Sequence, residues 1–302
     1  MSELALRVIF SVIAAPFALW IVLAGGAPLA ALLAIASAIG AWEFYRIARG
    51  TGAHPLADIG IAVAGLLPLA IHASYLGLFT VRPALVALLV LLVLGATIWL
   101  RGVDGHPVSS AATTLLGVIY TAGMLGFGYA IRYHDVVAGY DVVGAKHLAL
   151  GPFALPVPPG GVLLIFPILI TWASDIGAYF AGRAIGGRKL IPSVSPGKTV
   201  AGAVGGLVAS ILVSWLYARA VLVPVANVGF TPWGAVLFGV LVSVAAQVGD
   251  LFESLIKRDG GVKDSSHIIP GHGGALDRLD SLLFVLPVAY LLLGWLPIPI
   301  LR

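Results

Sequence analysis

The sequence predicts an all-α, polytopic membrane protein with about nine transmembrane helices. Hydrophobic residues make up 60% of the 302 residues and charged residues only 10%, whereas soluble domains carry about 25% charged residues. The mean hydropathy is +1.06. Most of the apolar residues also fall in stretches of about 20, the length that crosses a bilayer as a helix.

The nine expected spans are separated by mostly short polar segments. They cover residues 8–24, 28–48, 59–79, 84–100, 111–131, 161–180, 200–223, 233–255 and 279–298. Because most of the chain lies in these spans, little is left to form a separate water-soluble domain. We therefore expect one integral membrane domain, a helical bundle, over residues 1–302. Within it, residues 1–135 form amino-terminal helices and residues 161–302 form the helices and loops of the candidate site. No small-residue cleavage site follows the first apolar segment, which we interpret as a retained helix.

Composition excludes several kinds of chemistry. Cysteine is absent, so disulfides, thiolate nucleophiles and Cys-ligated metal sites are ruled out. The formal net charge is +4, but the basic residues lie in short loops, as the topology of a membrane protein requires. We therefore do not expect nucleic-acid binding.

The distribution of the 17 Lys and Arg residues predicts the orientation in the membrane. Twelve fall on the side of the amino terminus: Arg7, Arg46, Arg49, Arg101, Arg183, Arg188, Lys189, Lys198, Lys257, Arg258, Lys263 and Arg278. Five fall on the other side: Arg82, Arg132, Lys146, Arg219 and Arg302. Cytoplasmic loops carry the Lys/Arg excess, so the amino terminus should be cytoplasmic and the carboxyl terminus external. The polar segments 183–198 and 257–280 then share the cytoplasmic side.

Acidic residues concentrate near the carboxyl terminus. Six of the thirteen lie between Asp250 and Asp280. Asp250, Glu253 and Lys257 recur at i, i+3 and i+7 and therefore share one helix face. Glu253 and Lys257 could simply neutralise each other at a helix end. That explanation is weaker for Asp250, because a carboxylate inside a membrane is costly and usually marks function.

A glycine-rich loop follows this helix. Residues 260–261 and 270–274 supply flexible backbone whose N–H groups can surround phosphates. The chain then continues through Asp277 and Asp280, whose carboxylates share a helix face at i, i+3. Paired carboxylates suit Mg²⁺, which completes its coordination with water and substrate phosphates. Acids at a helix amino terminus would explain one Asp but not the whole cluster, so we expect Asp250, Asp277 and Asp280 to bind the metal.

A second polar cluster spans residues 174–199. Asp175 lies inside an apolar span, where either a helix–helix hydrogen bond or substrate binding would account for it. The following loop carries basic and hydroxyl side chains suited to phosphate oxygens. Residues 195–199 (SPGKT) are similar to a phosphate-binding P-loop. However, Pro192 replaces the first glycine and we expect no preceding strand, so we reject that motif.

Together these residues resemble the signature of the phosphatidate cytidylyltransferase family. The resemblance covers residues 254–258 (SLIKR), 263–264 (KD), 270–274 (PGHGG) and 277–280 (DRLD). The segment from Asp175 to Thr199 is similar to a second family motif. Glu43 and Tyr45 also match a family feature, although by themselves they would be read as a helix end whose polar groups reach water.

The resemblance implies that the protein joins CTP to phosphatidate, giving CDP-diacylglycerol and pyrophosphate. It also implies a requirement for magnesium, and allows potassium as a second cation next to it. It further implies a homodimer in the cell membrane whose active site faces the cytoplasm. One position departs from the family, because Ala201 stands where a glutamate is common. Any role of that glutamate cannot be transferred to this chain.

The reaction needs positioning and charge neutralisation, since the attacking phosphate oxygen is already anionic. We expect catalytic roles for Lys257, Arg258, Lys263, Asp264 and His272. We expect substrate binding by Asp175, Arg183, Lys189, Ser195, Lys198, Thr199, Gly273, Gly274 and Arg278.

Three other functions remain open at this stage. The same signature would serve a CTP-dependent enzyme that acts on another lipid phosphate. An ion-coupled transporter could use Asp175 and Asp250 to bind its ion. A CDP-alcohol phosphotransferase is disfavoured, because Asp277 and Asp280 are only three residues apart and its longer Asp-containing motif is missing.

Overall fold

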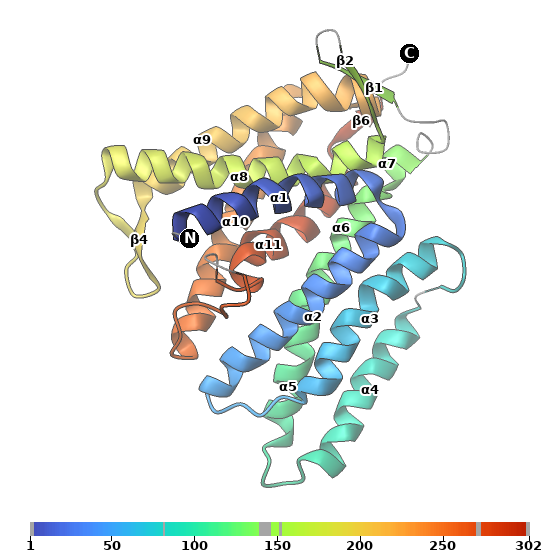
Figure 1. Ribbon diagram of the computed structural model, residues 1–302, viewed down its shortest axis with the longest axis vertical. Helices are drawn as coiled ribbons and strands as arrows, with labels where there is room; N and C mark the ends of the chain where they lie inside the picture. The colour runs from blue at the N-terminus through green and yellow to red at the C-terminus, as the bar shows by residue number, and fades with distance from the viewer. Residues whose placement is uncertain (1–2, 81, 139–145, 151–152, 270–272, 300–302) are drawn as a thin grey trace. The chain divides into compact units, whose positions relative to one another are not determined.

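The computed structural model describes residues 3–80, 82–138, 146–150, 153–269 and 273–299, and most of them are helical (Figure 1). The main helices are α1 Glu3–Ala24, α2 Gly26–Gly50, α3 Ala57–Tyr75, α4 Pro83–Leu100, α5 Pro107–Val118, α6 Met124–Arg132, α8 Pro159–Ile185, α9 Val200–Tyr217, α10 Pro232–Asp259 and α11 Leu276–Leu293. A short helix, α7, covers Asp135–Ala138, and π-helical segments η1 Ile119–Gly123 and η2 Ala218–Ala226 extend α5 and α9.

Six stretches are long and apolar enough to cross a membrane, as a multi-pass membrane protein requires. They are Gly26–Gly50, Ala57–Tyr75, Pro107–Val137, Pro159–Ile185, Val200–Ala226 and Pro232–Asp259. Each of the three other expected spans also contains a helix. The apolar helical stretches Ala14–Ala24 and Ala84–Leu100 are shorter, and α11 begins with charged residues. The total of nine spans therefore stays a prediction.

The chain forms two compact units, each discontinuous in sequence. The first contains Met1–Phe17, Gly26–Tyr129 and Glu253–Leu279, and the second contains Ala18–Gly25, Ala130–Phe252 and Asp280–Arg302. Helices α10 and α11 contribute to both. The single integral membrane domain expected from the sequence stays a prediction.

Tyr45 organises the packing of the first unit. Its side chain is 1% exposed, and its hydroxyl donates a hydrogen bond of 2.7 Å to the carbonyl oxygen of Thr114 in α5. A Cβ atom on Gly60 or Gly117 would overlap the tyrosine ring. Helices α2, α3 and α5 can therefore approach one another only because glycine occupies both positions.

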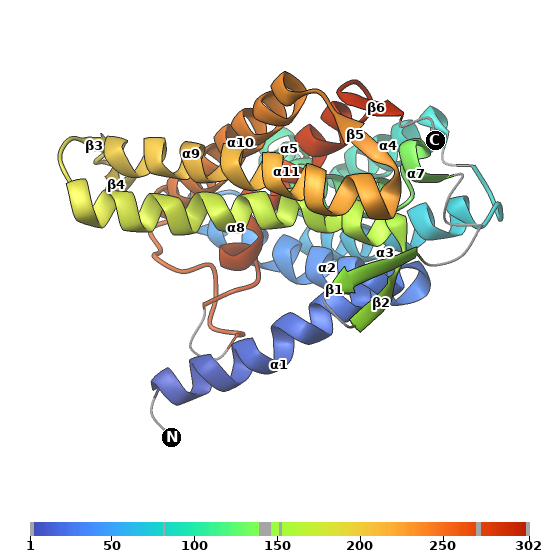
Figure 2. The same ribbon diagram turned by 90° about the horizontal axis from the view of Figure 1, so that it is seen from above.

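The second unit is built around helices α8 and α9, which run side by side (Figures 1 and 2). A Cβ atom on Gly177 would lie only 2.6 Å from the Cβ atom of Ala209, so the two helices are in close contact there. Small residues at such contacts let membrane helices pack closely. Deeper in the interface, the hydroxyls of Ser174 and Ser243 are 2.9 Å apart and join α8 to α10.

Three short antiparallel strand pairs lie between helices. Strand β1 Lys146–Leu150 pairs with β2 Phe153–Val157, β3 Lys189–Ile191 with β4 Ser195–Thr199, and β5 Val228–Phe230 with β6 Pro297–Pro299. The β3–β4 hairpin lies where the sequence predicts a loop. Strands of three to five residues are too short to show the alternation of polar and apolar residues that reveals longer strands.

Candidate active site

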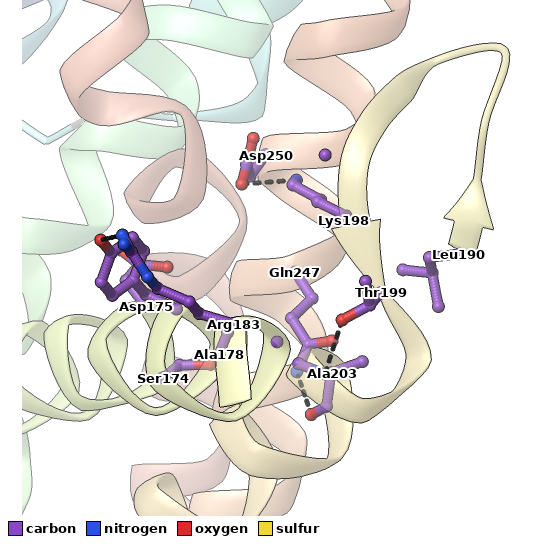
Figure 3. Close-up of a pocket in the computed structure, with 14 residues that line it drawn as sticks. Ser174, Asp175, Ala178, Arg183, Leu190, Lys198, Thr199, Ala203, Gln247 and Asp250 are labelled. Atoms are coloured by element: carbon purple, nitrogen blue, oxygen red, sulfur yellow. Dashed lines mark hydrogen bonds and ion pairs between the residues drawn. The ribbon is translucent and has the colours of Figure 1, made fainter. Parts of the chain in front are cut away.

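The second unit contains a cavity of about 590 Å³ that several predicted site residues line (Figure 3). Helix α8 contributes Asp175 and Arg183, the hairpin and its junction with α9 contribute Lys198 and Thr199, and α10 contributes Asp250. Residues far apart in the sequence are thus brought to one place. Carboxylates, two cations and a hydroxyl around one cavity suit a ligand that carries phosphate groups and a bound cation.

The β3–β4 hairpin delivers Lys198 and Thr199 to the cavity. Strand β4 ends at Thr199, which is the N-cap of α9: its side-chain oxygen accepts a hydrogen bond of 3.0 Å from the amide of Gly202. The expectation that no strand precedes residues 195–199 is therefore wrong, since β3 does. The structure does not revive the P-loop, because Pro192 still occupies the place of its first glycine.

Lys198 forms an ion pair with Asp250 (Figure 3). The side chains are 28% and 34% exposed, so this pair lies at the edge of the protein interior. Asp250 also interacts electrostatically with Asp175 and Asp280, and Lys198 interacts with both of these acids. A single lysine thus partly compensates three carboxyl groups, an arrangement that would favour a further cation.

On the opposite rim of the cavity, Arg183 is exposed and donates a hydrogen bond of 2.9 Å to the hydroxyl of Tyr179, one helical turn earlier. This contact leaves most of the guanidinium donors for another partner. Arg183 is therefore available to an anion in the cavity.

A different charged cluster lies in the first unit, around Lys257. Its ammonium group is 2.5 Å from the carboxylate of Glu253 and 2.7 Å from that of Asp277. Glu253 is 1% exposed. The proposed mutual neutralisation of Glu253 and Lys257 is thus present, but Asp277 joins it. Lys257 holds two carboxylates in place.

Asp277 is surrounded by donors. Its Oδ2 atom accepts hydrogen bonds from the amide and the hydroxyl of Ser265, at 2.9 and 2.8 Å, and from the amide of Gly274 at 2.9 Å. Burial by itself would raise the pKa of Asp277, but the hydrogen bonds from Lys257, Gly274 and Ser265 hold this pKa well below its usual range. The carboxylate is therefore ionised. Its Oδ1 atom accepts a hydrogen bond of 2.7 Å from Lys257, and the side chain of Glu253 also helps to lower the pKa of Asp277.

Glu43 is a buried residue that connects α2 to Ser265, Ser266 and the start of α11, and its burial was not predicted from the sequence. It is 0% exposed and accepts hydrogen bonds from the hydroxyls of Ser265 and Ser266, at 3.0 and 2.5 Å. It also accepts from the amides of Ala275 and Leu276, at 3.0 and 2.6 Å. The interpretation as a helix end reaching water is wrong. A glutamate inside the apolar segment 28–48 was the signal that pointed to this role.

The Glu43 network also explains a glycine. A Cβ atom on Gly274 would overlap the Ser265 hydroxyl and the Glu43 carboxylate. The amide of Gly274 is already bonded to Asp277. Gly274 therefore serves close packing and the start of α11, in addition to any contact with substrate. Ser265 has a single hydroxyl hydrogen, which Glu43 and Asp277 must share.

The other predicted residues are placed as follows. Arg258, Lys263 and Arg278 are exposed in the first unit, where Asp264 is half-buried and Gly273 pairs with Ile269. Lys189 and Ser195 lie on β3 and β4 but do not line the cavity. His272 lies outside the described residues.

The predicted magnesium ligands divide between these two sets of contacts. Asp250 and Asp280 interact electrostatically within the second unit, whereas Asp277 takes part in the Lys257 cluster of the first. Within the described ranges, no group of three or more acidic or histidine side chains forms a ready metal site. Two carboxylates suffice for Mg²⁺ when phosphates complete its coordination, so the chemistry of Asp250 and Asp280 fits the ion. Magnesium binding by Asp250, Asp277 and Asp280 stays a prediction.

We predict that Glu43→Gln destabilises the protein. Glutamine offers one acceptor oxygen to four donors and turns an NH₂ group toward some of them, and each buried donor left unpaired costs about 1–3 kcal/mol. Asp104→Asn, at an exposed carboxylate, is the matched control and should change stability by less than about 0.5 kcal/mol. Melting curves in detergent measure both. Equal melting temperatures for the two variants would contradict the role assigned to Glu43.

Comparison with known proteins agrees with this description. A sequence profile described as the Cytidylyltransferase family matches residues 5–296. Similar curated proteins named phosphatidate cytidylyltransferase include one from Brucella suis, 38% identical over 183 residues that cover 58% of this chain and 66% of that protein. Proteins of the same name from Haemophilus influenzae and Bacillus subtilis are each 42% identical, over 48% and 45% of this chain and 50% and 48% of their own lengths. The chain thus spans from about half to just under two thirds of these relatives. Because the profile extends over nearly all of its length, the chain belongs to the cytidylyltransferase family.

Proposed function

We propose that the protein is a phosphatidate cytidylyltransferase of the cell membrane. A phosphate oxygen of phosphatidate attacks the α-phosphorus of CTP, the bond to the β-phosphate oxygen breaks, and CDP-diacylglycerol and pyrophosphate form. The observation that carries the proposal is the second-unit cavity, in which cations and carboxylates from two helices and a hairpin surround about 590 Å³. Family membership supports the same conclusion.

Lys198 and Arg183 bind the phosphates in this proposal. Lys198 is paired with Asp250, so each charge is compensated while no substrate is bound. A phosphate group would give Lys198 a new anionic partner and release Asp250 for a cation. The exchange keeps every charge paired, which a partly enclosed site requires. Lys189, Ser195 and Thr199 support the hairpin that carries Lys198 and extend its binding surface.

Asp250, Asp277 and Asp280 would hold magnesium, with Asp175 beside them and potassium as a second cation. Bound magnesium would supply charge neutralisation on the phosphate oxygens and on the leaving pyrophosphate. Asp250 and Asp280 already interact electrostatically. Asp277 would be the third carboxylate ligand.

The first unit supplies further positive charge in this proposal. Lys257 fixes Asp277, while Arg258, Lys263 and Arg278 neutralise phosphates at the membrane surface. Asp264 orients Lys263 or a nucleotide hydroxyl. Gly273, Gly274 and His272 shape the glycine-rich segment, and the protein acts as a homodimer with its amino terminus and active site on the cytoplasmic side.

Turnover tests the reaction directly. Purified protein in detergent should convert labelled CTP and phosphatidate into CDP-diacylglycerol. The variant Lys198→Ala should raise the KM for CTP about tenfold to a hundredfold, because it removes one charge-assisted contact with the phosphates. Arg188→Ala is the matched control, since this exposed arginine lies just before β3 and does not line the cavity. A panel of lipid phosphates distinguishes phosphatidate from another acceptor. Absence of CTP turnover by the wild type would refute the proposal.

The metal assignment predicts a higher magnesium requirement. Asp→Asn at positions 250, 277 and 280 keeps the side-chain size but removes the charge that a hard cation needs. Each variant should need more magnesium for half-maximal turnover. The melting temperature should stay near that of the wild type for Asp250→Asn and Asp280→Asn, whereas Asp277→Asn should also lower it, because the amide accepts less well from Lys257, Ser265 and Gly274. Asp259→Asn, at an exposed acid of the same helix as Asp250, is the control. Wild-type turnover at ordinary magnesium by the variants at 277 and 280 would contradict the assignment.

The proposed orientation is open to labelling, because the chain contains no cysteine. A cysteine at Gly261, an exposed position after α10, should react with a membrane-impermeant maleimide only after the cells are permeabilised. A cysteine at Arg219, on the predicted external side, should react in intact cells. The reverse pattern would overturn the orientation.

A further inference from the structure

We propose that Gln247 selects the nucleobase in the cavity: its side-chain carbonyl accepts a hydrogen bond from the exocyclic amino group of cytosine. The proposal rests on the proposed use of CTP and adds the residue that distinguishes it from UTP. Gln247 belongs to α10, three residues before Asp250, and lines the same cavity (Figure 3).

The orientation of the Gln247 amide follows from its partners. Its Nε2 atom is 3.2 Å from the carbonyl oxygen of Ala203 in α9 and 3.2 Å from the hydroxyl of Ser243 in α10. A backbone carbonyl has no hydrogen to donate, so only the NH₂ group can face Ala203. The opposite orientation would place two oxygens against each other. The amide is therefore fixed with its nitrogen toward the protein.

The hydroxyl groups that hold the Gln247 amide are buried. Ser243 is 0% exposed and Ser174 is 1% exposed, and their hydroxyls are 2.9 Å apart. This chain of hydrogen bonds connects α8, α9 and α10 below the charged residues. Both hydrogens of the Gln247 nitrogen are used within it, so this group has no donor left for a ligand.

The remaining polar atom of Gln247 is its carbonyl oxygen, Oε1. None of the described residues donates a hydrogen bond to Oε1. The atom is not fully enclosed by protein, so a ligand can reach it. The residue itself is half-buried at the cavity wall. A ligand in the cavity thus meets a fixed acceptor that requires a donor.

The cavity changes in character along the helices. Four charged residues line the cavity: Lys198, Arg183, Asp250 and the exposed Asp175. The more enclosed part of the lining is neutral, with the buried Ser174, the half-buried Gln247 and the small side chain of Ala203. Gln247 is about one helical turn deeper than Asp250. A nucleoside triphosphate has the same gradient, with charge at the phosphates and a neutral base at the other end. The base therefore fits the more enclosed part while the phosphates meet the cations.

The chemistry of the acceptor then identifies the base. Cytosine carries an amino donor at the position where uracil carries a carbonyl acceptor. With uracil, the carbonyl oxygen of the base would face Oε1, and neither acceptor would receive a hydrogen bond. Two unpaired acceptors in an enclosed site weaken binding. The diacylglycerol part of phosphatidate has ester oxygens but no donor, so it cannot satisfy Gln247.

The test compares nucleotides within one protein sample. The kcat/KM for CTP, UTP and dCTP is measured with phosphatidate for the wild type and for Gln247→Met, which keeps the length of the side chain and removes the acceptor. We expect the CTP/UTP ratio to fall about tenfold to a hundredfold in the variant, with the CTP/dCTP ratio unchanged. Because each ratio is taken on the same sample, a lower folded fraction cancels.

Lys198→Ala is the matched control from the same cavity. It removes a phosphate contact that CTP and UTP share, so it should lower kcat/KM for both and leave their ratio unchanged. If Gln247→Met has too little turnover to measure, nucleotide preference is measured by binding instead. The rise in melting temperature caused by CTP is then compared with the rise caused by UTP. The wild type should be stabilised more by CTP and the variant equally by both.

The possible outcomes separate this inference from the proposed function. A wild type that turns over CTP, combined with an unchanged CTP/UTP ratio in Gln247→Met, overturns the inference alone. A changed CTP/dCTP ratio with an unchanged CTP/UTP ratio also overturns it, since Gln247 would then contact the ribose. A wild type without CTP turnover overturns the proposed function and this inference with it.

Discussion

Carboxylates enclosed by protein must be compensated, and this requirement governs both units of the structure. Burying a carboxylate without partners is far more costly than any single packing contact. Glu43 is met by two hydroxyls and two backbone amides, and Asp277 by an ammonium group, a hydroxyl and two amides. These contacts hold Ser265, Ser266 and residues 274–276 at the start of α11, so the compensation of two acids determines the backbone there.

The acids of the second unit are compensated less completely. Asp175, Asp250 and Asp280 interact with one another, and Lys198 is the cation that acts on them. Such a surplus of negative charge would be a defect in a purely structural cluster. In a site that receives a cation together with an anionic substrate, it is the condition that lets the cation enter.

The sequence predicted the helices well, because a stretch of apolar residues long enough for a bilayer leaves the backbone few alternatives. It also predicted that polar residues of segments 175–199 and 250–280 belong to one site. Asp175, Arg183, Lys198, Thr199 and Asp250 line one cavity, and the roles of all these residues stay predictions. The sequence did not predict their partners. The pairing of Lys198 with Asp250 depends on the β3–β4 hairpin, whose short strands carry no periodic pattern. Gln247 was overlooked because a single neutral amide in an apolar helix gives no signal until its hydrogen bonds are known.

The hydrogen bonds of Glu43 also have a consequence for synthesis. They join residues 222 to 233 positions apart in the chain. At 5–20 residues per second, the ribosome makes Glu43 roughly 10 to 45 s before its partners. Helix α2 is therefore made before the described hydrogen-bond partners of Glu43, which become available only when residues 265–276 have been synthesised. An unfinished copy carries an unpaired carboxylate in its second helix, a local instability of the kind that leads to degradation.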